Sequence, residues 1–137
     1  MAAFKKQSGR QQSVVGYADF DFSQLVSGVL KVLIELPPRA IIIAGALQTL
    51  TAFNSGTSDV ATIGDSGSAT RYKASATIAA AAYQVITPTG VEATTTALRN
   101  VGIVWTAVGT AATAGIGRLW LSYFVLGRAQ FSQGLDA

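Results

Sequence analysis

The stretch Gly28–Phe53, GVLKVLIELPPRAIIIAGALQTLTAF, decides the fold class of this chain. Its first part, Gly28–Leu36, alternates with a period of two, which is the side-chain period of a β-strand. Pro37 and Pro38 end this strand, because proline has no N–H to donate to a sheet ladder. The apolar positions that we expect to face the core are Leu30, Val32, Ile34 and Leu36.

A second strand is predicted in the run Ala40–Phe53, which is apolar and rich in β-branched residues. Gly45 within this run indicates a bulge or a close approach of another backbone. On the N-terminal side, Tyr17–Phe22 reads YADFDF and alternates strictly, which predicts a half-buried strand. We expect Asp19 and Asp21 on the solvated face of that strand, and a paired-carboxylate site is the less favoured alternative.

Further strand patterns follow toward the C-terminus. The run Ile116–Leu126 is apolar on both faces, so we expect a central strand that is covered on both sides. The pattern of residues 91–100 fits either a short strand or an irregular connection. Ala79–Ala82 could form a helical turn. About eight strands with Gly-rich turns predict a single β-sandwich or a closed barrel. The other predicted strands are Val60–Ile63, Arg71–Ile78, Ala81–Thr87 and Val101–Val108.

The composition excludes several classes of site. The 137 residues suffice for one domain, and they include neither Cys nor His. Disulfides, thiolate metal sites and Ser-His-Asp or Cys-His triads therefore cannot be built. Carboxylate chemistry remains, with seven Asp and Glu in the chain. We expect no catalytic residue, no metal and no cofactor.

The chain is unusually apolar. Hydrophobic residues make up 50% and charged residues 12%, against about 25% charged in an ordinary soluble domain. Such a surface indicates a membrane or an assembly. Gly and Thr interrupt the uncharged stretch Asn100–Gly117, and no apolar segment follows the first charges, so we expect neither membrane insertion nor a signal peptide. The net charge of +3 is small, so we expect no nucleic-acid partner.

The stretch Ala52–Tyr72 carries two carboxylates, Asp59 and Asp65, among Ser and Gly. It lacks the acidic spacing of an EF-hand, and a glycosidase would need carboxylates about 5 to 9.5 Å apart. We expect two strand connections, in which Asp65→Ala costs no more than about 1 kcal/mol and a chelator leaves the melting temperature unchanged. Sugar binding is possible at a few large aromatics, although such residues are more often core. These are Tyr72, Trp105 and Trp120.

The N-terminal segment, residues 1–13, is polar, Gln-rich and basic. It has no strand period and little apolar surface to bury, so we predict a flexible basic arm. Residues 14–137 then form the folded domain. The arm carries one large apolar residue, Phe4, and three cations, Lys5, Lys6 and Arg10.

Two segments resemble the small cement, or decoration, proteins of tailed-bacteriophage capsids, most closely that of a short-tailed Bordetella phage. They are TAFNSGTSDVATIGDSGSATRY at Thr51–Tyr72 and GRLWLSYFVLGRAQFSQG at Gly117–Gly134. The resemblance implies a jelly-roll sandwich without enzymatic activity. It also implies a virion protein on the outer capsid surface, where it would cement neighbouring major capsid proteins, with its own copies paired as a homodimer.

Given that resemblance, the arm is the expected capsid-binding element. Phe4 would enter an apolar cleft of the shell, and Lys5, Lys6 and Arg10 would face shell carboxylates. Pairing would use an apolar or strand-edge surface, because the chain has few charges to protect its strand edges. The alternative is a glycan- or receptor-binding module of a phage tail or head fibre. A membrane barrel and a small enzyme are less favoured.

Overall fold

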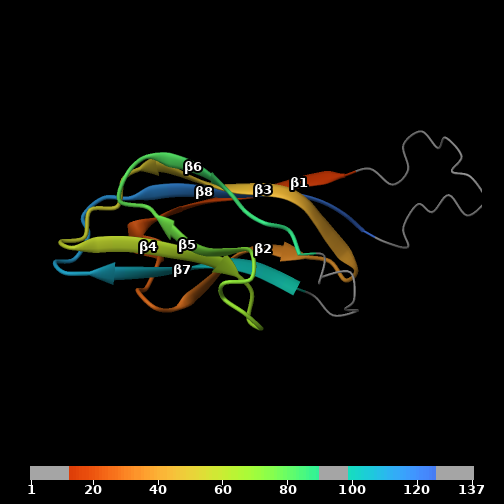
Figure 1. The fold of residues 1–137 in the computed structure, drawn as a ribbon, viewed down its shortest axis with the longest axis horizontal. Helices are drawn as coiled ribbons and strands as arrows, with labels where there is room; N and C mark the ends of the chain where they lie inside the picture. Colours follow the sequence, from red (N-terminus) through yellow and green to blue (C-terminus); the bar gives the residue numbers. More distant parts are fainter. Residues whose placement is uncertain (1–12, 90–98, 126–137) are drawn as a thin grey trace, which may run out of the picture.

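The computed structural model describes residues 13–89 and 99–125, and the rest of the chain is not described. The described residues form two four-stranded antiparallel sheets that pack face to face (Figure 1). The first sheet, here called the β1 sheet, has the strand order β1-β8-β3-β6, and the second, the β2 sheet, has the order β2-β7-β4-β5. The strands are β1 Val14–Asp21, β2 Leu30–Leu36, β3 Ala40–Thr51, β4 Ser58–Gly64, β5 Lys73–Thr77, β6 Ala82–Val85, β7 Arg99–Val108 and β8 Ile116–Val125.

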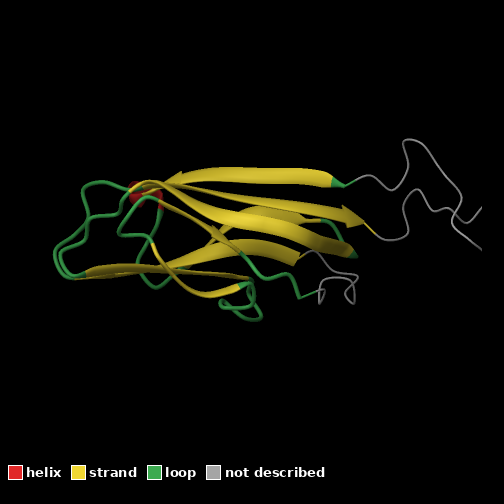
Figure 2. Ribbon diagram, turned by 45° about the horizontal axis from the view of Figure 1, so that its top comes forward, coloured by secondary structure: helices red, strands yellow, loops and turns green. Residues whose placement is uncertain are grey.

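The two interleaved strand orders are those of a jelly roll, in which two Greek keys fold onto each other. The predicted all-β jelly-roll sandwich is confirmed, and each of the eight predicted strands is present. One short 3-10 turn, η1 at Phe22–Gln24, is the single helical element in the described part of the chain (Figure 2). No helix there is long and apolar enough to cross a bilayer.

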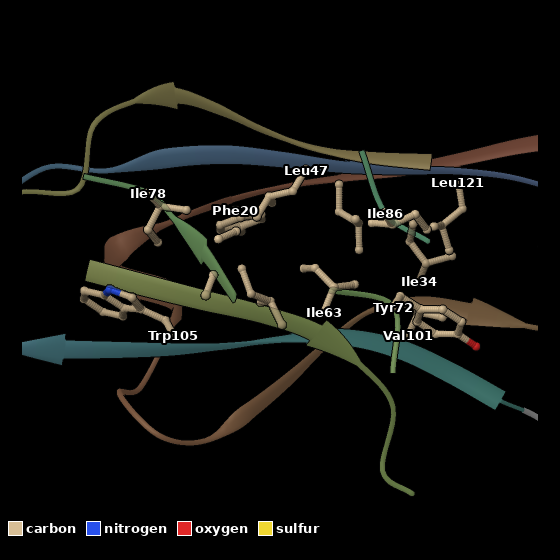
Figure 3. Close-up of a cluster of buried hydrophobic side chains, with 14 of the residues drawn as sticks. Phe20, Ile34, Leu47, Ile63, Tyr72, Ile78, Ile86, Val101, Trp105 and Leu121 are labelled. Carbon is tan, nitrogen blue, oxygen red and sulfur yellow. The ribbon is translucent and has the colours of Figure 1, made fainter. Parts of the chain in front are cut away.

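The core lies between the two sheets (Figure 3). Phe20 of β1, Phe53 after β3 and Trp105 of β7 are buried together, and the Phe53 and Trp105 rings meet edge to face with their centroids 5.3 Å apart. Burying each large apolar side chain contributes roughly 1.5–3 kcal/mol, so this layer supplies most of the stabilisation. Other wholly buried members are Leu36, Leu47, Ile63, Val101, Ile103, Leu119 and Leu121.

The predicted faces are correct for β1 and only partly correct for β2. In β1, Phe20 is buried and Tyr17 is 65% exposed, as the alternation predicted. In β2, Ile34 and Leu36 are buried, but Val32 is 40% exposed. The register with β7 shifts between Val32 and Ile34, so the extra residue, Leu33, turns toward the core instead. A bulge of this kind inverts the alternation on one side of itself.

Strands β3 and β8 show why Gly45 is a glycine. A Cβ on Gly45 would lie 2.6 Å from the Trp120 carbonyl oxygen, which confirms the predicted close approach. The bulge itself lies nearby, where the β3–β8 register shifts between Ile42 and Ala44. Strand β8 is central, as predicted, between β1 and β3. The expected cover on its second face was wrong for the described residues, because that face, with Trp120, remains partly exposed.

One end of the sandwich gathers the start of β1, the end of β8 and the β2–β3 turn. Val14 pairs with Tyr123, and Ala40 pairs with Val125. The turn contains Arg39, which is exposed and has a φ of 65°, a conformation that few residues other than glycine adopt. The chain that precedes Val14 therefore joins the domain at the end where Arg39 is exposed.

Candidate functional site

The stretch 52–72 folds as strand β4 with one connection before it and one after it, so the two predicted strand connections are present. Strand β4 is longer than predicted and begins at Ser58, two residues before Val60. Asp59 therefore lies inside the strand and faces the interior, where it is 1% exposed. This burial was not expected for a turn residue.

The Asp59 carboxylate is an internal hydrogen-bond acceptor. Trp105 donates its indole Nε1–H to Oδ1 at 2.8 Å, and Ser55 donates its backbone N–H at 2.8 Å and its hydroxyl at 2.6 Å. Trp105 comes from β7, and Ser55 comes from the β3–β4 connection. Asp59 thus fastens that connection to the core.

Asp65 holds the β4–β5 connection in the same way and is 2% exposed. It accepts the backbone N–H of Gly67 at 2.9 Å and that of Ser68 at 3.0 Å. The Arg71 guanidinium donates Nε–H to its other oxygen at 2.8 Å. No group of three His, Cys, Asp or Glu that could hold a metal ion occurs within residues 13–89 and 99–125. The geometry of both carboxylates is that of loop anchors.

Of the three aromatics considered for sugar binding, two are core residues. Tyr72 is 1% exposed and Trp105 is 6% exposed. Trp120 instead points to the outer face of the β1 sheet, where it lies directly opposite Tyr17 of β1. Strand register places Tyr83 of β6 on the same face, opposite Gln48 of β3. We call Tyr17, Tyr83 and Trp120 the aromatic face.

Polar contacts fix the side chains around the aromatic face. Arg118 donates Nε–H and Nη2–H to the two oxygens of Asp19, at 2.6 and 3.0 Å. Its guanidinium carbon lies 5.4 Å from the centroid of the Tyr17 ring. The hydrogen bond from Arg118 lowers the pKa of Asp19 below its usual value, and the same bond raises the pKa of Arg118.

The Trp120 indole reaches across β3, where its Nε1–H donates to the Tyr83 hydroxyl at 3.2 Å. Ala46 pairs with Trp120 and so points outward, yet it is wholly buried. The indole therefore covers Ala46. Beside it lies an open hollow of about 300 Å³ lined by Val15, Tyr17, Gln48, Arg118 and Trp120.

The sequence analysis did not predict that these residues form one hollow. The alternation in YADFDF places Tyr17 on the same face as Asp19 and Asp21, which we expected to be solvated, and the alternation in Ile116–Leu126 places Arg118 and Trp120 together on one face. Only the register of β1, β8, β3 and β6 brings these side chains side by side. The predicted capsid-binding residues Phe4, Lys5, Lys6 and Arg10 lie outside the described residues, as does most of the open segment 91–100.

No protein-family model matches the chain, and no curated protein matches it. Solved structures do match. A chain of the Cyanophage Pam1 capsid asymmetric unit aligns with a TM-score of 0.73 and 19% identity, over 91% of this chain and 93% of that one. A chain of the capsid of Ralstonia phage GP4 aligns with a TM-score of 0.64 and 16% identity, over 90% and 91%.

A third structure, the acid-stable capsid of Helicobacter pylori bacteriophage KHP30, contains a chain that aligns with a TM-score of 0.62 and 13% identity. The alignment covers 87% of this chain and 92% of that one. These identities are low, so the likeness establishes a shared fold.

Proposed function

We propose that this chain is a structural protein of a tailed-phage virion that binds the outer capsid surface and cements neighbouring major capsid proteins. The observation that carries the proposal is the mutual, nearly full-length match to a chain of the Pam1 capsid unit, 91% of one and 93% of the other. Such coverage means that the two chains have about the same length and are each accounted for by one sandwich. Fold likeness alone does not fix function, so the surface must also suit the role.

The surface suits burial against other proteins. Large apolar side chains stand exposed on both sheets and in the connections between them, while few charges separate them. Exposed apolar side chains on a chain with so few charges favour burial against partner proteins. Apart from Val15 and Tyr17, which line the hollow beside Trp120, the exposed residues are Val14, Val26, Val29, Val32, Ile43, Leu50, Tyr83, Val85, Val108 and Ile116.

The basic arm is the proposed attachment to the shell. It precedes Val14 and so joins the domain at the end where Arg39 is exposed, which would concentrate cations there. Ordering a free segment costs roughly 1–2 kcal/mol per residue, so the arm needs a partner surface to become ordered. Carboxylates of the major capsid protein would pair with Lys5, Lys6 and Arg10, and an apolar cleft would take Phe4.

Strand β1 is the proposed edge for pairing two copies. All eight of its residues keep register with β8 without a bulge, and it contains neither Lys nor Pro. Its other edge has no strand partner in the described part of the sheet, and Val14 and Val15 are 49% and 61% exposed. An edge without such protection readily adds another strand.

Deletion of residues 1–12 tests the arm. The truncated protein should keep its melting temperature within a few degrees, and co-sedimentation with empty capsid shells should weaken. Binding of the intact protein should also fall with added salt, because surface charges are screened. Unchanged shell binding would reduce the arm to an unused tail, and unfolding would place the domain boundary before Val14.

The alternative function, a glycan- or receptor-binding fibre module, predicts the opposite binding results. Such a protein would bind cells or sugars and leave empty shells bare. Sedimentation equilibrium at high micromolar concentration tests the pairing separately, and a strictly monomeric protein would overturn it.

A further inference from the structure

We infer that the hollow beside Trp120 on the outer face of the β1 sheet binds a neutral pyranose sugar. This inference does not depend on a shell-binding role. It rests on the shape of the hollow, on the aromatic rings at its sides and on the polar groups at its edge.

The shape comes from side-chain size. Strands β1, β8 and β3 line the hollow with side chains of unequal length: Tyr17, Arg118 and Trp120 are long, whereas Val15 and Gln48 are shorter. Side chains of unequal length leave a depression, here of about 300 Å³. This volume is at the lower end of the range for small-ligand sites, roughly 300–1,000 Å³. It fits one or two sugar rings.

The rings supply a stacking surface. A pyranose chair presents a patch of C–H groups on one face, and this apolar patch packs on an aromatic ring. Tyr17 is 65% exposed, and its place opposite Trp120 sets the two rings on adjacent strands. The bond from Trp120 to the Tyr83 hydroxyl holds the indole in place before any ligand arrives, which lowers the entropic cost of binding.

The polar groups at the edge of the hollow suit the hydroxyl groups of an uncharged ligand. Asp19 and Arg118 neutralise each other through two hydrogen bonds, and both remain partly exposed, with side chains 48% and 39% accessible. Their remaining lone pair and N–H positions, with the Gln48 amide nearby, can accept from and donate to vicinal sugar hydroxyls. Because the pair is neutral overall, an uncharged sugar is favoured over an anionic one.

A protein occupant fits this hollow less well. A standard protein interface covers about 800 Å² on each partner and excludes water from its centre. On this face it would have to desolvate the Asp19–Arg118 pair, which is costly unless the partner replaces the lost hydration. A sugar hydroxyl can replace that hydration within the hollow.

Ligand-observed NMR and calorimetric titration test the inference with the methyl pyranosides of glucose, galactose, mannose and N-acetylglucosamine. At least one should bind the intact protein with a millimolar or lower Kd. Tyr17→Phe keeps the ring and should change that Kd by no more than about twofold. Tyr17→Ala removes the stacking surface and should weaken binding about tenfold. Val108→Ala, an exposed position on the other sheet, is the matched control and should have no effect.

Two outcomes would overturn the inference. The first is that none of the four glycosides binds at tens of millimolar. The second is that Tyr17→Ala leaves sugar binding unchanged while it abolishes binding to empty shells, which would make this face a protein-docking surface. Sugar binding that depends on Tyr17 in a protein that never binds shells would support the sugar site and overturn the proposed function instead.

Discussion

Two regions of this molecule use the same residue type to opposite effect. On β4 and the connection after it, Asp59 and Asp65 are 1% and 2% exposed and accept hydrogen bonds from backbone and side-chain donors of the protein. On β1, Asp19 faces water in a surface ion pair, and Asp21 caps the short η1 turn. In the sequence, both pairs simply stand near Ser, Gly and aromatic residues.

The difference teaches that burial, and not the local motif, sets the cost of losing a carboxylate. A buried N–H or O–H donor that loses its acceptor cannot form a hydrogen bond to water instead. The folded state then carries the full desolvation penalty of that donor. An exposed donor exchanges one acceptor for a water molecule at little cost. The four Asp residues therefore form a graded series for mutagenesis.

Asp59→Ala should give the largest loss of the series, about 3 kcal/mol in the free energy of unfolding. The Trp105 indole N–H and both Ser55 donors would be left without their acceptor. Chemical denaturation of both proteins measures this loss. Trp105→Phe is the companion variant, and a double-mutant cycle with Asp59→Ala should show coupling between the two positions. A loss below about 1 kcal/mol for Asp59→Ala would contradict the comparison.

Asp65→Ala should cost about 2 kcal/mol, which revises the sequence-based expectation of about 1 kcal/mol upward. The substitution removes the carboxylate acceptor of Gly67, Ser68 and Arg71, while the Ser68 N–H keeps the Asp65 backbone carbonyl at 3.2 Å. The loss stays below that of Asp59 because the Arg71 side chain is 23% exposed and can reach water. The melting temperature of the wild-type protein should not change with EDTA. A drop with EDTA that calcium restores would show that Asp65 serves a metal instead.

Asp21→Ala should lower the melting temperature measurably, by less than half of the Asp65 shift. Asp21 accepts the backbone N–H of Ser23, and the Gln24 side chain completes a capping box by accepting the Asp21 N–H. Gln24→Ala removes only the reciprocal half and should have a smaller effect still. Scanning calorimetry compares the variants. A shift as large as that of Asp65→Ala would mean that exposure does not set the cost.

Substitution of Asp19 should give the smallest change in stability of the four, and this change should depend on pH. The Arg118 hydrogen bond holds the folded-state pKa of Asp19 below its ordinary value of 3.8. Its stabilisation is therefore present above about pH 4 and is lost as the pH falls through the lowered pKa. Asp19→Asn should therefore lower the neutral plateau slightly and leave the stability at the acid end nearly unchanged, which flattens the acid limb of the stability curve. Melting temperatures between pH 2 and 7 measure this, and an unchanged acid limb would exclude the Arg118 contribution.

The sequence predicted the elements of this fold well because strand alternation and proline or glycine breaks are local signals. The alternation in YADFDF and the break at Pro37 both correspond to observed structure. The prediction failed at Val32, because a bulge depends on how β2 matches β7, which lies about seventy residues away. The resemblance to the Bordetella phage cement protein stays a prediction.

By itself, the sequence determined the strand class, the number of strands, the shared face of Tyr17, Asp19 and Asp21, and the exclusion of His- and Cys-based chemistry. Only the tertiary structure decided which Asp residues are buried and which aromatics share a face. The physical reason is that alternation fixes the side of a strand on which a residue lies, whereas burial depends on the opposing layer and proximity depends on inter-strand register. Trp105 and Trp120 follow the same local pattern, yet one completes the core and the other lines the hollow.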